Sequence, residues 1–265
     1  MNILAIETTE AKASVALINE KGEVSLEASD EKMNHLQNLI PIIDALLKKR
    51  ELSIDDINYV AVSEGPGSFT GIRIGVASAR ALAQALGVKT IAVPTLQSFL
   101  YHAYDYNGII CPIFDARRNQ VYSGAYQWVR NEFPEKSKNE YLSSKKFQSS
   151  YKELVAGDAY DLPQLLEKLR TVLLEESNER MTSEVTFFGD GIIPYKKQII
   201  DWQNSSLNDN IRVLFADDDI RLQNASSVAR MALEYYREGK IKSLYDLKPA
   251  YMRKAEAERK LEEKS

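Results

Sequence analysis

Cysteine and histidine are nearly absent from this chain, which holds one cysteine, Cys111, and two histidines, His35 and His102. A single cysteine cannot close an intramolecular disulfide, and so few sulfur and imidazole ligands cannot build a Cys/His zinc cage. The composition therefore excludes a disulfide scaffold. It favours the reducing cytoplasm as the location.

Long hydrophobic runs are absent as well. Glu7 interrupts the first apolar run before a signal-peptide core of about seven residues has formed, and nowhere do roughly eighteen apolar residues follow one another. We therefore expect no export signal and no membrane span.

Neither sign of charge dominates, because 34 Lys and Arg residues stand against 38 Asp and Glu residues, a net charge of −4. Binding to nucleic acid depends on cations that neutralise phosphates. An anionic chain lacks that excess of cations. We therefore expect any grip on RNA to come mainly through a partner.

The remaining composition is that of an ordinary globular protein. Hydrophobic residues make up 44% of the 265 positions and charged residues 27%, with 12 glycines and 8 prolines. At roughly 150 residues a domain, this length predicts about two domains, each able to bury its own core.

The first half of the chain predicts strands and helices in alternation. Residues 3–6 form an apolar run, and alternating stretches around residues 15–17 and 24–26 flank a turn at 20–22, which indicates a three-stranded meander. A helix is expected over 35–50, with Asn34 as a candidate N-cap and Pro41 inside it. The strand 57–62, the loop 63–68, the helix 69–86 closed by Gly87 and the strand 89–93 then form a βαβ unit, which predicts parallel pairing.

The second half begins after a helix expected over 94–106. Strands are predicted over 109–114 and 120–129, joined by a turn at 115–119. Residues 130–151 are polar without a sustained period, which indicates a long surface connection. A helix over 162–175, a strand over 185–188, a loop at 189–191 and a helix over 227–238 follow, and the tail after Arg253 is expected to fray.

Two glycine-bearing or polar loops could bind an anion. The loop from Ser63 to Ser68 joins a strand to a helix, so that Gly65 and Gly67 would let a phosphate approach free N–H groups at the helix start. It matches neither a Walker loop nor a dinucleotide fingerprint, and a tight turn with Ser68 as N-cap remains the alternative.

The segment Glu7-Thr8-Thr9 follows the first strand, where actin, hexokinase and the heat-shock ATPases place an Asp-Gly-Thr phosphate hairpin. Here Glu replaces the Asp and Thr replaces the Gly, so that the backbone cannot approach a phosphate as closely. A polar strand end is the alternative interpretation. Gly189-Asp190-Gly191 lies where those ATPases have their adenosine loop, although such a sequence is common in plain turns.

The other reactive side chains do not indicate a catalytic site. Cys111 follows two isoleucines on an apolar strand, which is typical of an inert core thiol. No His-Glu-x-x-His zinc motif is present. Asp115, Arg117 and Arg118 could hold a phosphate or a partner carboxylate, and an exposed turn explains them equally well.

The helix over 69–86 is apolar almost all round between residues 72 and 86, where only Arg73, Ser78, Arg80 and Gln84 are polar. Such a helix must be covered on more than one side. Gly75 and Ala79 would let another helix approach closely, and burial within the lobe is the alternative. On the helix over 35–50, Ile42 and Leu46 extend the apolar stripe sideways.

Four segments together closely resemble the bacterial TsaB family, also called YeaZ. They are the opening Ile3-Leu4-Ala5-Ile6-Glu7-Thr8-Thr9, the run Gly65-Pro66-Gly67-Ser68-Phe69-Thr70-Gly71-Ile72-Arg73-Ile74-Gly75, Asp115-Ala116-Arg117-Arg118 before Val121-Tyr122, and Ala250-Tyr251-Met252-Arg253. The likeness covers the chain to about Arg253 and is strongest over residues 1–125.

This resemblance implies an α/β fold of the actin-like ATPase (ASKHA) type, with two lobes that each contain a mixed sheet flanked by helices, the second lobe reduced. The expected domains are an N-terminal lobe over 1–107, a C-terminal lobe over 108–220, a C-terminal helix and strand-like end over 221–253 that pack back on the first lobe, and a frayed tail over 254–265.

The resemblance also implies a role in forming threonylcarbamoyladenosine next to the anticodon of tRNAs that read codons beginning with A. In that system TsaC makes threonylcarbamoyl-adenylate, TsaD transfers the group, TsaE is an ATPase that binds the pair, and TsaB is a non-catalytic partner. TsaD has two metal-binding histidines where this chain has Thr95 and Phe99. A phenylalanine has no lone pair and a threonine hydroxyl is a poor ligand, so we expect no metal and no catalytic residue here.

The resemblance implies that the helices 35–50 and 69–86 pair with those of TsaD as a four-helix bundle, or with another copy of this chain, with ATP or ADP at the TsaD interface and tRNA held through the complex. The expected interface residues are Leu39, Ile42, Ile43, Leu46, Leu47, Ile72, Gly75, Val76, Ala79 and Leu82. The candidate nucleotide or anion contacts are Thr8, Thr9, Gly65, Gly67 and Ser68. The alternatives are a stand-alone ATPase or sugar-kinase-like enzyme that uses the Glu7 hairpin, and a homodimeric RNA-binding module, which the net charge disfavours.

Overall fold

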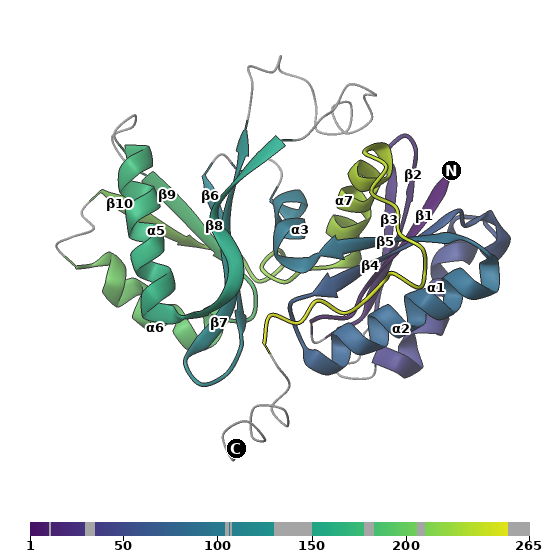
Figure 1. Ribbon diagram of the computed structural model, residues 1–265, viewed down its shortest axis with the longest axis horizontal. Coiled ribbons are helices and arrows are strands. Elements are labelled where there is room, and N and C mark those ends of the chain that lie inside the picture. Colours follow the sequence, from purple (N-terminus) through teal and green to yellow (C-terminus); the bar gives the residue numbers. More distant parts are fainter. Residues whose placement is uncertain are drawn as a thin grey trace.

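The computed structural model describes residues 1–10, 12–29, 35–103, 106, 108–129, 150–177, 183–205 and 210–253, which form two lobes side by side (Figure 1). The candidate N-cap Asn34, most of the expected surface connection and the tail after Arg253 lie outside these residues. No helix in the described ranges is both long enough and apolar enough to cross a membrane.

The first lobe is built on a five-stranded sheet with the order β3-β2-β1-β4-β5. Its strands are β1 (Asn2–Glu7), β2 (Ser14–Asn19), β3 (Val24–Ala28), β4 (Tyr59–Gly65) and β5 (Lys89–Pro94). The first three strands are antiparallel, whereas β4 pairs in parallel with both β1 and β5. The predicted meander and the predicted parallel βαβ unit are both confirmed.

Helices cover both faces of this sheet. On one face lie α1 (His35–Lys49) and α2 (Phe69–Leu86), whose apolar sides enclose a core with β1, β2 and β4. A short 3-10 turn, η1 (Ile54–Asp56), leads into β4. The sequence predicted both ends of α2, because the Ser68 side chain accepts a hydrogen bond from the Gly71 N–H at 3.3 Å and Gly87 is left-handed at φ 67°.

The opposite face carries α3 (Thr95–His102) and α7 (Ala225–Arg237). Because α7 contacts β1, β2 and β5, the end of the chain returns to the first lobe. The helix expected over 94–106 is shorter than predicted, since Ala103 leaves the helical region at φ −107° and ψ 44°. No glycine or proline marks that end in the sequence.

The second lobe contains a sheet with the order β10-β9-β6-β7-β8. The strands are β6 (Ile109–Asp115), β7 (Gln120–Val129), β8 (Ser150–Asp161), β9 (Ser183–Phe188) and β10 (Ile211–Phe215). The helices α5 (Leu162–Ser177) and α6 (Ile192–Gln203) pack on its outer face. This sheet is also mixed, because β6, β9 and β10 are parallel and β7 and β8 are antiparallel to their neighbours.

Three elements of this lobe were not predicted from the sequence: β8, α6 and β10. The strand β8 lies at the edge of the sheet, and its consecutive residues Lys152 and Glu153, which point to opposite faces, are both exposed and interrupt the alternation of polar and apolar residues. In α6 the buried positions are Ile192, Tyr195 and Ile199, and Pro194 in its first turn obscures the helical pattern. These elements are stabilised by packing against the neighbouring strands and the core of the lobe.

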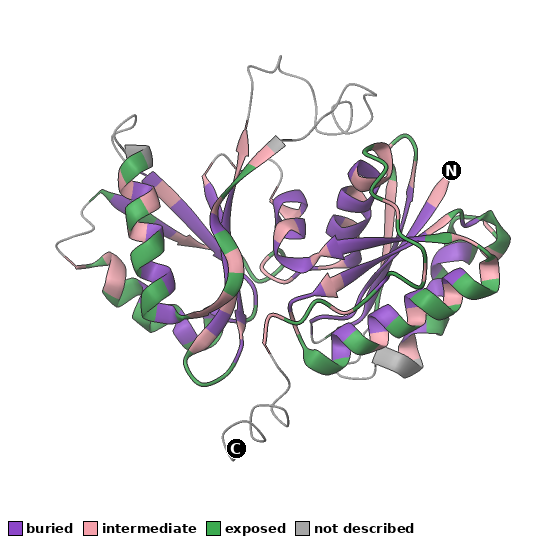
Figure 2. Cartoon of the chain, viewed as in Figure 1, coloured by how far each residue is buried: buried purple, intermediate pink, exposed green. Residues whose placement is uncertain are grey.

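The two lobes share one apolar core. The Phe99 ring on α3 lies with its centroid 5.8 Å from that of Phe114 and 5.9 Å from that of Phe188, both in the second sheet. The inner face of the second sheet is therefore covered by the first lobe (Figure 2).

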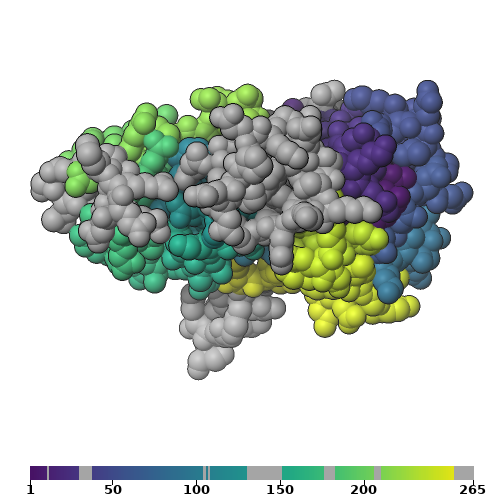
Figure 3. All heavy atoms as spheres, turned by 90° about the horizontal axis from the view of Figure 1, so that it is seen from above, coloured from purple at the N-terminus to yellow at the C-terminus, as the bar shows by residue number. Residues whose placement is uncertain are grey.

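A C-terminal strap, residues 242–253, also joins the lobes. It starts beside β5, where the Thr90 N–H donates to the Lys242 carbonyl at 3.0 Å, and passes β4, where the Ala250 N–H donates to the Glu64 carbonyl at 2.7 Å. It ends at the second lobe, where Arg253 Nη1 donates to the Ala116 carbonyl at 2.7 Å. In the space-filling view the yellow-green end of the chain lies against the blue first lobe and reaches the teal second lobe (Figure 3).

Candidate functional site

The side chain of Glu7, at the end of β1, occupies the hairpin where an actin-like ATPase would hold phosphate. Glu7 is fully buried, and its carboxylate accepts hydrogen bonds from the Thr9 N–H, the Thr9 hydroxyl and the Ser63 hydroxyl. The hairpin donors that a phosphate would need are therefore taken by the chain's own carboxylate.

Two opposing effects act on the Glu7 carboxyl. Burial raises its pKa above the usual value, because a charge in an apolar environment loses its hydration. The hydrogen bonds from Ser63 and Thr9 act in the opposite direction, because they stabilise the ionised form. Burial is the larger effect, so the pKa of Glu7 is raised on balance.

The loop between β4 and α2 closes over this hairpin. The Ser68 N–H donates to the Thr9 carbonyl at 3.0 Å, and a Cβ on Gly67 would lie 2.6 Å from Thr9 Cβ. The Thr8 hydroxyl donates to the Gly71 carbonyl at 2.8 Å. The structure thus brings the two predicted anion-binding loops together, and their polar groups bond to each other.

The five candidate anion contacts differ in exposure. Thr8, Thr9 and Gly65 are buried, Gly67 is half-buried and Ser68 is exposed. Gly65 adopts a left-handed φ of 122°, and a Cβ there would collide with the Ala250 carbonyl of the C-terminal strap. The glycines of this loop therefore serve close backbone packing rather than an open phosphate site.

A second polar cluster lies where the chain crosses from the second lobe to the first. The Gln223 side-chain amide donates to Ser63 Oγ at 3.2 Å. Nearby, the Ala225 N–H donates to Ser14 Oγ at 2.9 Å. These bonds fix the entry into α7 against the turn between β1 and β2.

Glu10 is the most perturbed acid of this crossing. Glu10 is 6% exposed, and no donor among the described residues reaches its buried Oε1 or the buried Oε1 of Gln223. Burial raises the pKa of Glu10 well above its usual value, the charges of Asp190 and Glu7 raise it further, and Arg221 lowers it. Sequence reasoning missed Glu10 and Gln223, since only the fold places them together.

The Gly189-Asp190-Gly191 loop is also filled by the protein itself. The Gly189 N–H donates to the Arg221 carbonyl at 2.6 Å and the Gly191 N–H to the Ile113 carbonyl at 3.0 Å. A Cβ on either glycine would press on that Ile113 carbonyl. The adenosine loop of an ATPase is thus replaced here by backbone packing.

The positions that correspond to metal ligands in TsaD belong to the core. Thr95 and Phe99 are both fully buried in α3. Within the described ranges, no cluster of three or more His, Cys, Asp or Glu side chains is arranged to hold a metal ion. Cys111 is buried with its Sγ 3.5 Å from Ser123 Oγ, and burial raises the pKa of the thiol to about 12, as expected for an inert core cysteine.

The predicted interface residues on α1 and α2 are mostly inward-facing. The core of the first lobe contains Leu39, Ile43, Leu46, Leu47, Ile72, Val76 and Ala79. Ile42 and Leu82 are half-buried. Gly75 faces its own lobe and does not mark a close approach to a partner helix as predicted, because a Cβ there would meet the Thr8 hydroxyl.

A different set of side chains faces outward on the same two helices (Figure 2). On α2 the outward side carries an alanine stripe, Ala77, Ala81 and Ala85, and on α1 Ile40 is 58% exposed. The periodicity of the sequence showed that both sides of α2 are apolar. It could not show which side the sheet covers.

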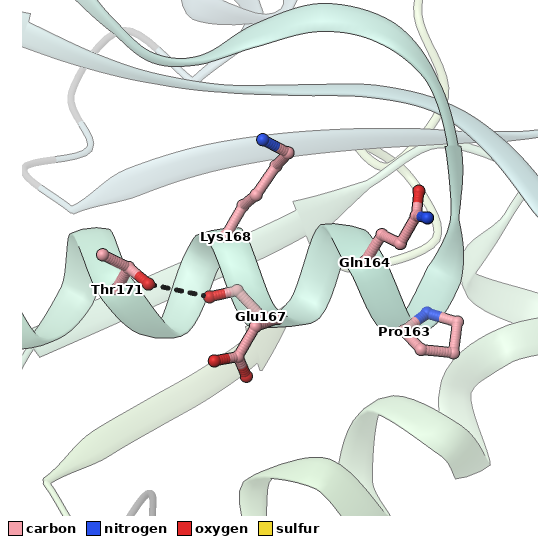
Figure 4. A pocket seen from close by; sticks show the side chains of 5 residues that line it. All are labelled: Pro163, Gln164, Glu167, Lys168 and Thr171. Carbon is pink, nitrogen blue, oxygen red and sulfur yellow. Dashed lines mark hydrogen bonds between the residues drawn. The ribbon is translucent and has the colours of Figure 1, made fainter.

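A shallow surface depression on α5 is lined by Pro163, Gln164, Glu167, Lys168 and Thr171 (Figure 4). All five lie on one helix, and the Thr171 hydroxyl donates to the Glu167 carbonyl of the same helix at 3.2 Å. No second element contributes a converging polar group among the residues that line it. This depression is not a candidate site.

Two lobes, each a mixed five-stranded sheet flanked by helices, with a polar hairpin at the end of β1, define the actin-like ATPase class of folds. A family model described as TsaD, tRNA N6-adenosine threonylcarbamoyltransferase, matches residues 27–261. The chain therefore belongs to this family, in its TsaB (YeaZ) branch.

Similar proteins support that placement. The TsaB protein of Escherichia coli, named a tRNA threonylcarbamoyladenosine biosynthesis protein, is 27% identical over 264 residues, 98% of each chain. The Bacillus subtilis TsaB protein is 38% identical over 128 residues, which cover 48% of this chain and 56% of that protein. The solved structure of YeaZ from Pseudomonas aeruginosa has a TM-score of 0.66 at 21% identity and covers 94% of this chain and 99% of its own.

Proposed function

We propose that this chain is a non-catalytic subunit that dimerises with TsaD and works with TsaE in the threonylcarbamoylation of tRNA. The modified base is the adenosine 3′ to the anticodon in tRNAs that read ANN codons, and the donor is the product of TsaC. The names of the similar TsaB proteins support the pathway. The observation that carries the non-catalytic role is the Glu7 carboxylate inside its own phosphate hairpin.

The occupied hairpin argues against a stand-alone ATPase or sugar-kinase-like enzyme. A nucleotide phosphate would have to displace Glu7 from its donors and the Ser68 loop from Thr9 at the same time. It would also place the negative charge of the phosphate in the buried surroundings of Glu7 and Glu10, where a charge loses its hydration and costs free energy. We therefore assign any ATP or ADP to the interface with TsaD rather than to this hairpin.

The outward face of α1 and α2 is the surface we assign to TsaD. The alanine stripe of α2 lets another helix approach closely, and Ile40 adds an exposed apolar side chain beside it. A partner of the same fold would present the equivalent helix pair, so that four helices pack together. A second copy of this chain would use the same face.

The reaction itself tests this proposal. TsaC, TsaD, TsaE, unmodified tRNA, threonine, bicarbonate and ATP are combined with this chain omitted or added, and modified adenosine is measured by mass spectrometry. We expect modification to depend on the added chain. The purified chain alone should neither hydrolyse ATP nor transfer the group, and it should bind tRNA weakly, given its net charge of −4. Stoichiometric ATP turnover that survives removal of contaminants would overturn the non-catalytic role.

This complex would act in the cytoplasm, where tRNA and the TsaC product are available. The role of TsaE belongs to the same proposal. Leaving TsaE out of the reaction tests it separately, because modification should then fall even with this chain present.

A further inference from the structure

An exposed stack of planar side chains begins at the start of α2. The rings of Phe69 and Tyr251 lie 4.7 Å apart at an interplanar angle of 28°, and the guanidinium of Arg73 lies 4.0 Å from the Phe69 centroid. Arg73 Nε also donates to the Tyr251 hydroxyl at 2.7 Å. Phe69 remains 36% exposed and Tyr251 41% exposed, so both rings stay open to solvent at their edges.

The C-terminal strap connects this stack to the second lobe. Two residues beyond Tyr251, Arg253 holds the Ala116 carbonyl at the start of the turn between β6 and β7. In that turn Arg117, Arg118 and Asn119 all adopt left-handed conformations, with φ of 67°, 56° and 60°. Such conformations are uncommon for residues other than glycine, and a run of three costs free energy that the fold must supply.

The strained turn points its two arginines outward. The Arg117 side chain is 88% exposed, and its nearest acid, Asp115, lies 3.6 Å from Nη1. An exposed ion pair of this length contributes little and leaves the guanidinium open to a ligand. Arg118 is exposed beside it. We define Phe69, Arg73, Arg117, Arg118, Tyr251 and Arg253 as the basic ridge.

The basic ridge concentrates positive charge on a chain that is acidic as a whole. It holds four arginines, with Asp115 beside Arg117 as a partly compensating acid, whereas the chain has a net charge of −4. Guanidinium groups form planar forks that match phosphate oxygens, and exposed aromatic rings accept an unstacked base. The ridge also begins at Phe69 and Arg73, on the helix whose outward face we assign to TsaD.

We propose that the basic ridge binds the phosphodiester backbone of tRNA, with Phe69 and Tyr251 next to an unpaired base, when this chain is part of the modification complex. The proposal rests on the proposed function and names the surface through which this subunit contacts the substrate. The ridge lies beside the partner face, so that RNA held by the partner can extend across it. An acidic protein segment is the competing occupant.

The test uses the complex of this chain with TsaD and a double variant, Arg117→Asn with Arg118→Asn. Asparagine tolerates the left-handed conformation, so the turn keeps its shape while two cations are removed. We expect the tRNA association constant of the complex to fall about tenfold. Its dependence on salt should weaken by about 1.8 in the slope of log K against log salt, for two lost contacts to duplex phosphates.

A matched control removes two exposed cations elsewhere. Lys196 and Lys197 lie on the exposed side of α6 in the second lobe, and Lys196→Asn with Lys197→Asn changes the net charge by the same amount. This control should leave the salt slope unchanged. If both double variants weaken binding equally, the effect is one of net charge and the assignment of the ridge is wrong.

Calorimetry separates the two macromolecular partners. Replacing Arg117 and Arg118 should not alter affinity for TsaD, so a loss of TsaD binding in the double variant would show a protein-docking surface and overturn the proposal. If the wild-type complex fails to form or to modify tRNA, the proposed function fails. The ridge is then tested on the isolated chain, with tRNA at low salt and fluorescence anisotropy as the readout. Equal binding by the wild type and the double variant there would overturn the ridge.

Discussion

The carboxylate of Glu7 accepts hydrogen bonds from both the backbone N–H and the hydroxyl of Thr9, inside a hairpin that is closed to solvent. In an open phosphate hairpin a glycine exposes that N–H to the ligand. Here the longer Glu side chain folds back onto the turn, and Thr9 completes the contact. Both Thr9 donors are local, whereas the Ser63 hydroxyl, the other donor to this carboxylate, comes from β4, 56 positions along the chain.

Removing the Glu7 carboxylate should destabilise the first lobe. Glu7→Ala leaves the hydroxyls of Thr9 and Ser63 and the backbone N–H of Thr9 buried without this acceptor, and we expect a loss of about 3 kcal/mol in the free energy of unfolding. Urea denaturation measures the loss. Glu175→Ala, an exposed change on α5, is the matched control and should stay within about 0.5 kcal/mol of the wild type.

Substitutions on the sheet-facing side of α2 should affect folding, and substitutions on its exposed side should affect partner binding. Gly75→Ala puts a methyl group against the Thr8 hydroxyl and should lower the free energy of unfolding by about 1 to 3 kcal/mol. Ala81→Glu, on the exposed side, should leave the fold intact and abolish TsaD association and tRNA modification together. Circular dichroism and calorimetry with TsaD check the two outcomes. A folded Ala81→Glu protein with unchanged affinity would place the partner elsewhere.

Glu234 on α7 should make stability depend on pH. Burial raises the pKa of this carboxyl from 4.5 to about 7, although Arg237 lowers it in part. A raised pKa in the folded state contributes stability below pH 4.5, and that contribution is lost as the pH rises towards 7. Glu234→Gln should therefore gain about 1 kcal/mol relative to the wild type at pH 8, allowing for solvent screening.

The gain of Glu234→Gln should vanish near pH 5, where the wild-type carboxyl is largely neutral. Thermal unfolding at the two pH values provides the measurement. Glu175→Gln serves as the control for a surface acid. An equal gain at both pH values would mean that packing, and not ionisation, separates the variant from the wild type.

Ionisation of the Glu10 carboxyl should loosen the segment where the chain crosses from the second lobe to the first. Its neutral form can donate a proton to an acceptor and so satisfy a buried oxygen, whereas its ionised form faces Asp190 and Glu7, with Arg221 as the compensating cation. Because its pKa is raised, the wild type should lose protection at the Ala225 backbone N–H, which donates to Ser14 Oγ at this crossing, as the pH rises. Glu10→Gln, which stays neutral, should keep that protection. Hydrogen exchange with mass spectrometry measures it.

Two further variants should shift that transition in opposite directions. Asp190→Asn removes a negative charge, which lowers the pKa of Glu10 and should move the loss of protection to lower pH. Arg221→Gln removes the cation, which raises the pKa of Glu10 and should move the loss to higher pH. Shifts in the same direction for both variants would contradict an ionisation of Glu10 as the cause.

Local sequence patterns were sufficient for much of the first lobe. The apolar run before Glu7, the alternation around Val15 and Leu17, and the caps Ser68 and Gly87 are local signals, and each predicted element formed. In the second lobe β8, α6 and β10 escaped prediction. Edge strands and helices with an early proline are stabilised by packing against elements that are distant in the chain. A short stretch of sequence does not show which elements those are.

The candidate site shows the same division. Sequence alone marked Thr8, Thr9, Gly65, Gly67 and Ser68 as polar or glycine-rich loop positions, and the structure brings them together. The hydrogen bonds between the two loops could not be predicted, since they join residues far apart in the chain, 63 positions in the case of Thr8 and Gly71. For the same reason the periodicity of α2 revealed two apolar sides without revealing which one lies on the sheet.

The sequence by itself determined the family, the βαβ core of the first lobe and the lack of a Cys/His metal set, because these depend on residue types at fixed spacings. Only the tertiary structure decided that Glu7 fills its own hairpin, that Gly75 faces Thr8, and that the C-terminal strap brings Tyr251 to Arg73 across 178 positions of the chain. Such contacts depend on how packed elements are oriented. That orientation is set by burial over the whole molecule rather than by any local pattern.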